Sequence, residues 1–88
     1  MEPITSRRNP LVGRLRALHQ ARGRRDQERL LLEGTHLLQE VLRLGLSADL
    51  LVATPAWIER HPELLKSCEA IERIIPVSAA VLEAIATT

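Results

Sequence analysis

Short apolar runs alternating with helix-start signals are the feature that most constrains the fold of this chain. The runs are Leu30–Leu32, Ala48–Ala53 and Ile74–Val77, and the helix starts that follow them are Thr35, Thr54 with Pro55, and Ser78. Short, nearly continuous apolar runs are typical of strands buried on both faces, and Thr, Ser and Pro are favoured where helices begin. Three strand-and-helix repeats favour a mostly parallel sheet covered on both faces. The predicted fold class is α/β, a small three-layer α/β/α sandwich.

A further helix is predicted ahead of these repeats, beginning at Asn9 and Pro10. The asparagine side chain can accept a free N–H of the first turn, and proline suits the first helical position. Three leucines then recur at helical spacing, namely Leu11, Leu15 and Leu18. Gly23 ends this pattern, and the polar, charged residues 22–29 predict a loop or a frayed last turn.

The remaining helices are bounded by similar signals. Thr35 is expected to be the N-cap of the next helix, which should stop at Gly45, a residue type common just after a helix. Its apolar positions are Leu37, Leu38, Val41, Leu42 and Leu44. Pro62 interrupts the following helix, so Pro55–Arg60 is expected to make only a turn or two before a restart that runs toward Glu69. The last helix is predicted to bury Val81, Leu82 and Ile85.

Length and apolar distribution indicate one domain. Eighty-eight residues can bury one core but not two independent ones. The longest uninterrupted apolar runs have four residues, far below the roughly 20 needed to span a bilayer, and no apolar segment follows the N-terminal arginines as in a secretory signal. The single cysteine, Cys68, fits a reducing compartment and is expected in the core. A cytoplasmic location without membrane contact is therefore expected.

The charge is distributed unevenly along the chain. Residues 1–29 carry eight arginines against three acids, a net charge of +5, whereas residues 30–88 carry four cations against eight acids, a net charge of −4. Arginine suits bidentate contacts with phosphate, so a basic block of this kind indicates binding to a polyanion. The proposed RNA-binding residues are Arg7, Arg8, Asn9, Arg14, Arg24 and Arg25, with Asn9 acting mainly as a helix cap.

Little in the sequence supports an enzyme. The three histidines, at positions 19, 36 and 61, are far apart and lack neighbours at metal-ligand spacing, and the glycines at 13, 23, 34 and 45 form no phosphate-binding loop. No catalytic, cofactor-binding or metal-binding residue is assigned. Trp57 is the only aromatic residue and is expected to anchor its helix to the core. Domains that stack several bases on aromatic side chains are disfavoured, so nucleic-acid contacts would go to phosphates and overall shape.

The order of these residues resembles a known family. The segment from Ile4 to Val12, with Ser6 and the pair Asn9-Pro10, is followed by Leu15 and Leu18, by Arg25, and by the run Leu31-Leu32-Glu33-Gly34 with Glu40. This arrangement is similar to the substrate-binding N-terminal domain of SpoU-type (TrmH-like) RNA 2′-O-ribose methyltransferases of the SPOUT superfamily. The resemblance covers essentially the whole chain. It departs from the family pattern at Glu28 and Leu30, where a glycine and an aromatic residue are common, and Glu28 places an acid beside the proposed RNA face.

The resemblance implies an α/β fold related to ribosomal and kink-turn-binding proteins. It further implies that residues 1–88 hold structured rRNA or tRNA while a separate knotted domain transfers a methyl group from S-adenosylmethionine. That SPOUT domain would follow Thr88 and is absent from this chain, so the fragment is not expected to be catalytic or to bind a cofactor itself. A homodimer of the full-length parent through the missing domain is also implied.

A different class of function stays open. The domain could be an interaction or positioning module whose main contacts are with its own catalytic domain or another subunit, because 16 leucines may exceed what one small core can hide. A stand-alone enzyme is the weakest interpretation, since no acid/base pair, nucleophile or metal cluster can be assembled.

Overall fold

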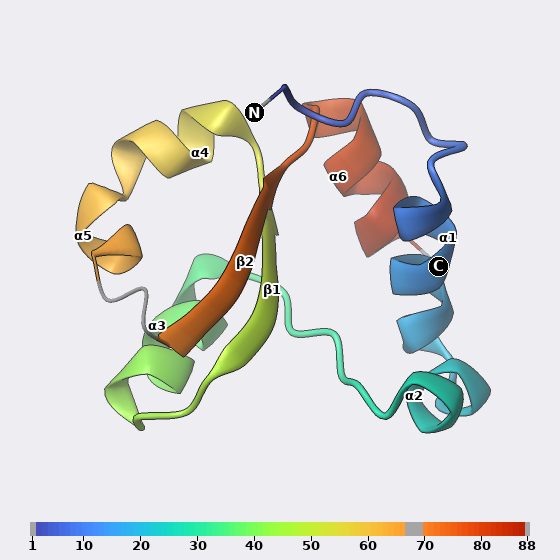
Figure 1. Cartoon of the computed structure of the whole chain (residues 1–88), viewed down its shortest axis with the longest axis horizontal. Coiled ribbons are helices and arrows are strands. Elements are labelled where there is room, and N and C mark those ends of the chain that lie inside the picture. Colours follow the sequence, from blue (N-terminus) through green and yellow to red (C-terminus); the bar gives the residue numbers. More distant parts are fainter. Residues whose placement is uncertain (1, 67–69, 88) are drawn as a thin grey trace.

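Two parallel strands form the middle layer of the domain in the computed structural model, which describes residues 2–66 and 70–87. Helices α3 (Thr35–Arg43), α4 (Pro55–Arg60) and α5 (Pro62–Leu65) lie on one side of strands β1 (Ala48–Ala53) and β2 (Ile71–Pro76). On the other side lie α1 (Pro10–Arg16), the 3₁₀-helix η1 (Ala17–His19), α2 (Ala21–Gln27) and α6 (Ala79–Ala86). Figure 1 shows these three layers. The predicted α/β class with a parallel sheet is therefore confirmed.

The strands pair over most of their length. Leu50 lies opposite Arg73 and Val52 opposite Ile75, so each pair shares one face of the sheet. At the end of β2, the N–H of Val77 donates to Ala53, while Ile4 forms an isolated parallel bridge with Val77. The N-terminal segment thus lies on the edge of β2 that faces away from β1.

Three predicted helix starts are confirmed by hydrogen bonds. The Oδ1 of Asn9 accepts from the N–H of Leu11 at 2.9 Å. Thr54 Oγ1 accepts from the N–H of Trp57 at 3.2 Å, and Ser78 Oγ accepts from the N–H of Val81 at 3.2 Å. Each bond satisfies a backbone donor that the helix itself leaves free. The caps fix where α1, α4 and α6 begin.

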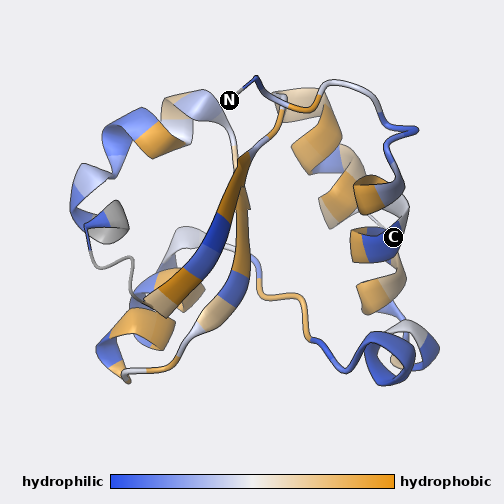
Figure 2. Cartoon of the chain, viewed as in Figure 1, coloured by the Kyte–Doolittle hydropathy of each residue, from blue (hydrophilic) through white to orange (hydrophobic). Residues whose placement is uncertain are grey.

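The core lies between the sheet and helices α1 and α6. Its buried members are Val12, Ile75, Val77, Val81 and Ile85. Leu50 and Val52 of β1 pack against this cluster, as do Ile4 and Leu82. Val77 and Val81 have no exposed surface, and Figure 2 shows the apolar residues gathered on the strands and on the facing sides of α1 and α6. The predicted inner face of the last helix, which includes Val81 and Ile85, is confirmed.

The strand predicted at Leu30–Leu32 is wrong. Residues 29–33 form an irregular segment, and the side chains of Leu30 and Leu32 are 73% and 55% exposed. An apolar run becomes a strand only when its backbone pairs with a neighbour. Among the described residues, no backbone hydrogen bond involves Leu30, Leu31 or Leu32.

The loop predicted over residues 22–29 is also wrong, because most of it is helix α2. Gly23 does not end a helix but lets α2 approach η1. A Cβ at this position would overlap the carbonyl oxygen of Ala17 and lie 2.6 Å from its carbonyl carbon. Gln27 Nε2 also donates to the carbonyl oxygen of Arg14 at 2.8 Å, which ties the end of α2 to α1. Tertiary contacts thus stabilise a helix that its polar sequence does not indicate.

The ends of some helices and strands also differ from those predicted. Helix α3 begins one residue earlier than predicted, with Gly34 in the cap position at φ 99°, and it ends as predicted at Gly45, where φ is 73°. Strand β2 begins at Ile71 rather than Ile74. The expected continuation toward Glu69 and the expected core position of Cys68 lie outside the described residues. No helix in the described ranges is long and apolar enough to cross a membrane.

Candidate nucleic-acid interface

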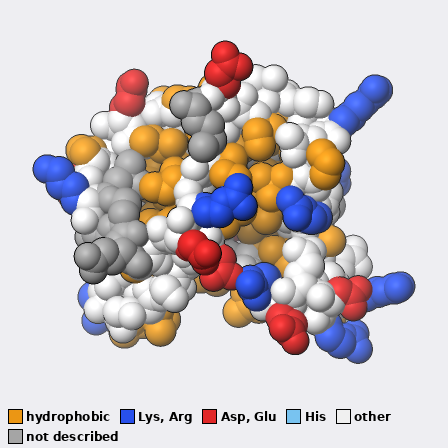
Figure 3. Space-filling view, in the orientation of Figure 1, with side chains coloured by type: hydrophobic (Ala, Val, Ile, Leu, Met, Phe, Trp, Pro, Cys, Tyr) orange, Lys and Arg blue, Asp and Glu red, His pale blue; other side chains and the backbone are white. Residues whose placement is uncertain are grey.

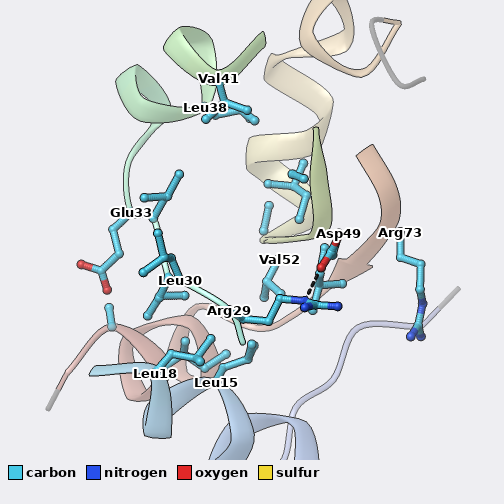
Figure 4. A pocket seen from close by; sticks show the side chains of 18 of the residues that line it. Leu15, Leu18, Arg29, Leu30, Glu33, Leu38, Val41, Asp49, Val52 and Arg73 are labelled. Carbon is cyan, nitrogen blue, oxygen red and sulfur yellow. Dashed lines mark ion pairs between the residues drawn. The ribbon is translucent and has the colours of Figure 1, made fainter. Parts of the chain in front are cut away.

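An apolar groove of about 1450 Å³ lies between β1 and the helices α1, η1 and α3. Its apolar lining includes Leu15, Leu18, Leu38, Val41 and Val52. Figure 4 shows these side chains around the groove, with the segment that carries Leu30 running along it. In the space-filling view, apolar surface is visible between charged side chains near the centre of the molecule (Figure 3). The groove is therefore an apolar hollow with a charged rim.

Arginines from five parts of the chain converge on this groove. They are Arg14 of α1, Arg24 and Arg25 of α2, Arg29 of the following segment, Arg60 of α4 and Arg73 of β2. Arg14, Arg25, Arg60 and Arg73 are exposed, and within the described residues their guanidinium groups make no hydrogen bond or ion pair with the protein. These four cations are available to an anionic ligand.

Arg24 and Arg29 are already engaged. The Nη1 of Arg24 donates to the carbonyl oxygen of Leu18 at 3.1 Å, which supports the junction between η1 and α2. Arg29 forms an ion pair with Asp49 of β1, drawn as a dashed line in Figure 4, and both side chains are about half exposed. Arg24 thus has a structural role, and Arg29 attaches its segment to the sheet.

The predicted residues Arg7, Arg8 and Asn9 lie elsewhere. They form the turn before α1 and do not line the groove. Arg7 and Arg8 are exposed, the N–H of Arg8 donates to Ser6 Oγ at 3.1 Å, and Asn9 caps the helix. Arg14 lies four residues after Pro10, the first residue of α1, which is roughly 6 Å along the helix axis at 1.5 Å per residue. The structure brings Arg14, Arg24 and Arg25 together and leaves Arg7 and Arg8 at the other end of α1.

Three groove arginines, Arg29, Arg60 and Arg73, were missed by sequence reasoning. Arg73 belongs to β2, and its position opposite Leu50 places it on the face of the sheet that packs toward α1 and α6. The signal in the sequence is an arginine inside an apolar strand, at Ile71–Pro76. The predicted strand began at Ile74, so Arg73 fell just outside it and its place in the sheet was not recognised.

Acidic side chains divide the positive rim. Glu28, Glu33, Asp49 and Glu72 also line the groove. Glu28 ends α2 in the left-handed conformation, with φ 54°, and Glu33 Oε1 lies 3.9 Å from Nε2 of His19. The departure noted at Glu28 therefore does place an acid beside the arginines. The available positive charge comes from Arg14, Arg25, Arg60 and Arg73.

Two of the histidines and the tryptophan make structural contacts. His19 Nε2 donates to the carbonyl oxygen of Ile85 at 2.7 Å, which joins η1 to α6. Trp57 Nε1 donates to Thr35 Oγ1 at 3.0 Å, and its ring stacks on His61 with centroids 4.4 Å apart. Trp57 therefore anchors α4 to α3 through a hydrogen bond. Within residues 2–66 and 70–87, no three His, Cys, Asp or Glu side chains are grouped so that they could hold a metal ion.

Comparison with known proteins adds two matches. Residues 9–88 match the family model described as the MRM3-like substrate binding domain. The chain is also similar to an uncharacterised tRNA/rRNA methyltransferase of Synechocystis sp., with 51% identity over 61 residues. That alignment covers 69% of this chain and 22% of the longer protein. No solved structure matches the chain. The family resemblance inferred from the residues between Ile4 and Glu40 is confirmed.

Proposed function

Because the chain belongs to the family of MRM3-like substrate-binding domains, we propose that it binds structured RNA, either rRNA or tRNA, on the arginine-rimmed groove. The observation that carries the proposal is the convergence of Arg14, Arg25 and Arg73, from three different elements, on one side of the domain. Guanidinium groups bind phosphate oxygens in pairs of parallel hydrogen bonds. Membership of the family indicates RNA as the ligand, and the arginines around the groove would make the contacts with its phosphates.

The chemistry of the contact is electrostatic and depends on RNA shape. The only tryptophan is engaged with Thr35 and His61, and the chain has no tyrosine or phenylalanine, so stacking of bases on aromatic side chains contributes little. Phosphate contacts release counterions, which makes affinity depend on salt. If about four arginines reach phosphates, log K falls with log salt at a slope of about −3 by the single-strand coefficient, and somewhat more steeply on a duplex.

In this proposal the domain holds the RNA for methyl transfer but does not catalyse the transfer itself. The relative from Synechocystis is named a tRNA/rRNA methyltransferase, and this chain spans about a fifth of its length. In the proposal, a separate SPOUT domain binds S-adenosylmethionine and transfers its methyl group to a ribose 2′-OH of RNA that the present domain holds. The parent acts in the cytoplasm as a homodimer formed through that second domain. No residue of this chain is given a catalytic role.

A titration tests this function. Backbone amide NMR spectra of the chain are recorded with a structured rRNA fragment at low and at moderate salt. Shifts concentrated on the groove arginines and weakening with salt are expected. Unchanged spectra of the folded protein at low salt would refute RNA binding by this domain.

A second candidate function rests on the exposed leucines. Leu30, Leu32, Leu37, Leu44 and Leu46 are all more than one-third exposed, which is typical of a surface that contacts another protein. On this interpretation the domain positions its own catalytic domain or another subunit. Sedimentation of the isolated chain separates the two functions, because a mass that rises with concentration and no response to RNA would favour protein contacts.

A further inference from the structure

Helix α3 and the turn after it carry an exposed apolar stripe that lies outside the groove. Its members, Leu37, Leu44 and Leu46, are 45%, 59% and 54% exposed, and none of them lines the groove. Leu37 and Leu44 are about two helical turns apart, so they lie on the same side of α3, with Val41 between them. Exposed leucines that adjoin one another are typical of a surface that contacts another protein.

Two opposite charges border this α3 stripe. Glu40 and Arg43 are both exposed and form an ion pair of 2.7 Å within the helix. At about 100° per residue, both charged side chains fall on one flank of the line that joins Leu37 and Leu44. Leu38 falls on the other flank and lines the groove. The exposed flank of the stripe therefore carries one acid and one base.

We propose that a second copy of this chain packs on the α3 stripe, with the two α3 helices antiparallel about a two-fold axis between Glu40 and Val41. Leu37 of each copy then meets Leu44 of the other, because the two leucines lie equally far from the axis in sequence. Antiparallel packing brings the same flank of both helices together, so Glu40 of one copy faces Arg43 of the other. The surface thus supplies both members of each charge pair, as a two-fold interface requires.

The charges favour a second copy over a partner of one charge sign. An acidic partner would be repelled by Glu40 and a basic partner by Arg43, whereas a second copy satisfies both residues. The contact is small, because α3 has nine residues and is about 13 Å long. Interfaces well below the standard size are weak, so we expect a dissociation constant of the order of 0.1 mM.

Pairing through α3 leaves much of the RNA surface free. Helices α1 and α2, which carry Arg14 and Arg25, lie on the opposite side of the strands from α3 (Figure 1). The inference rests on the second candidate function, for which it names the surface and the partner, and does not depend on RNA binding.

Two leucines of nearly equal exposure provide a matched test. Leu44 is 59% exposed on the stripe, and Leu32 is 55% exposed beside the groove. The self-association of the unmodified chain and of each variant is measured by sedimentation equilibrium, without RNA, up to about 1 mM protein. Leu44→Ser should weaken association at least about tenfold, because each pair loses two leucines, whereas Leu32→Ser should leave it unchanged. Circular dichroism checks that both variants are folded.

Two results of this measurement would overturn the proposal. An unmodified chain that stays monomeric at the highest concentration would exclude the pair. Equal effects of Leu44→Ser and Leu32→Ser would exclude the α3 stripe as its surface, while the second candidate function would stand.

Exchange of charges tests the antiparallel register. Arg43→Glu makes both bordering positions acidic, and Glu40→Arg makes both basic, so each variant alone should associate about two- to fivefold more weakly than the unmodified chain. An equimolar mixture should regain association as a mixed pair, because acids of one copy then face bases of the other. A mixture that associates no better than either variant alone would overturn the register and with it the proposal.

Discussion

Substitution of Gly23 by alanine tests the packing of α2 on η1, the contact that distinguishes this structure most clearly from its sequence prediction. Alanine in the middle of a helix is favoured over glycine by about 1 kcal/mol when nothing opposes it. At Gly23 the added Cβ would overlap the carbonyl oxygen of Ala17. The neighbour is backbone, which cannot rotate away as a side chain can, and overpacking of this kind costs about 1–3 kcal/mol.

Gly13 provides the matched control. It lies within α1, and a Cβ there would meet no atom within 4 Å. Gly13→Ala should therefore stabilise the domain by about 0.5–1 kcal/mol, whereas Gly23→Ala should destabilise it by about 1–2 kcal/mol. In a domain of this size the two variants would differ in Tm by about 10 °C.

Thermal unfolding followed by far-ultraviolet circular dichroism measures both effects. Urea unfolding followed by the fluorescence of Trp57 checks them at constant temperature. If Gly23→Ala stabilises the domain as much as Gly13→Ala, the close approach of α2 to η1 is refuted.

Three further predictions follow from single contacts. Val81→Ala removes two methyl groups from a fully buried position and should lower the free energy of unfolding by about 2 kcal/mol in urea. Thr54→Ala removes the cap of α4 and should cost about 1 kcal/mol in the same assay, with Thr54→Asp retaining most of the stability. A double-mutant cycle on Arg29 and Asp49 should give a coupling of about 0.2–1 kcal/mol that decreases as salt is raised, because the pair is half exposed. A coupling that does not respond to salt would contradict an exposed ion pair.

Local signals in the sequence predicted the parts of the fold that local contacts determine. Asn9, Thr54 and Ser78 cap helices through bonds to residues two or three positions away, so the signal and its partner are read together. Gly45 likewise ends α3 where predicted, with its N–H donating to Leu42. Strand β1 was predicted with its observed bounds because its apolar run is flanked by turn residues on both sides.

Contacts between distant parts of the chain explain what the sequence did not predict. Whether Leu30–Leu32 forms a strand depends on the edge of β1, about 20 residues away, and not on the leucines alone. Gly23 was expected to end a helix, as glycine often does, but the turn between η1 and α2 brings it against Ala17, six residues earlier, where a side chain would not fit.

For the candidate site too, local signals were predicted from the sequence and contacts between distant residues were not. The sequence located the basic block and hence Arg14 and Arg25, but only the sheet register places Arg73 beside them. Arg7 and Arg8 belong to the same block in sequence, yet α1 separates them from the groove.

The central claim is that groove arginines, and not positive charge in general, hold RNA, and a matched pair of double variants tests it most directly. Arg14→Gln with Arg25→Gln removes two groove cations, whereas Arg16→Gln with Arg22→Gln removes the same charge from the same two helices outside the groove. The measurement is the salt dependence of affinity for a structured rRNA fragment, by fluorescence anisotropy. The groove variant should bind more weakly, with a slope shallower by about 0.7–0.9 for each lost phosphate contact, and the control should keep the slope of the unmodified chain. Equal losses in both variants would contradict the account.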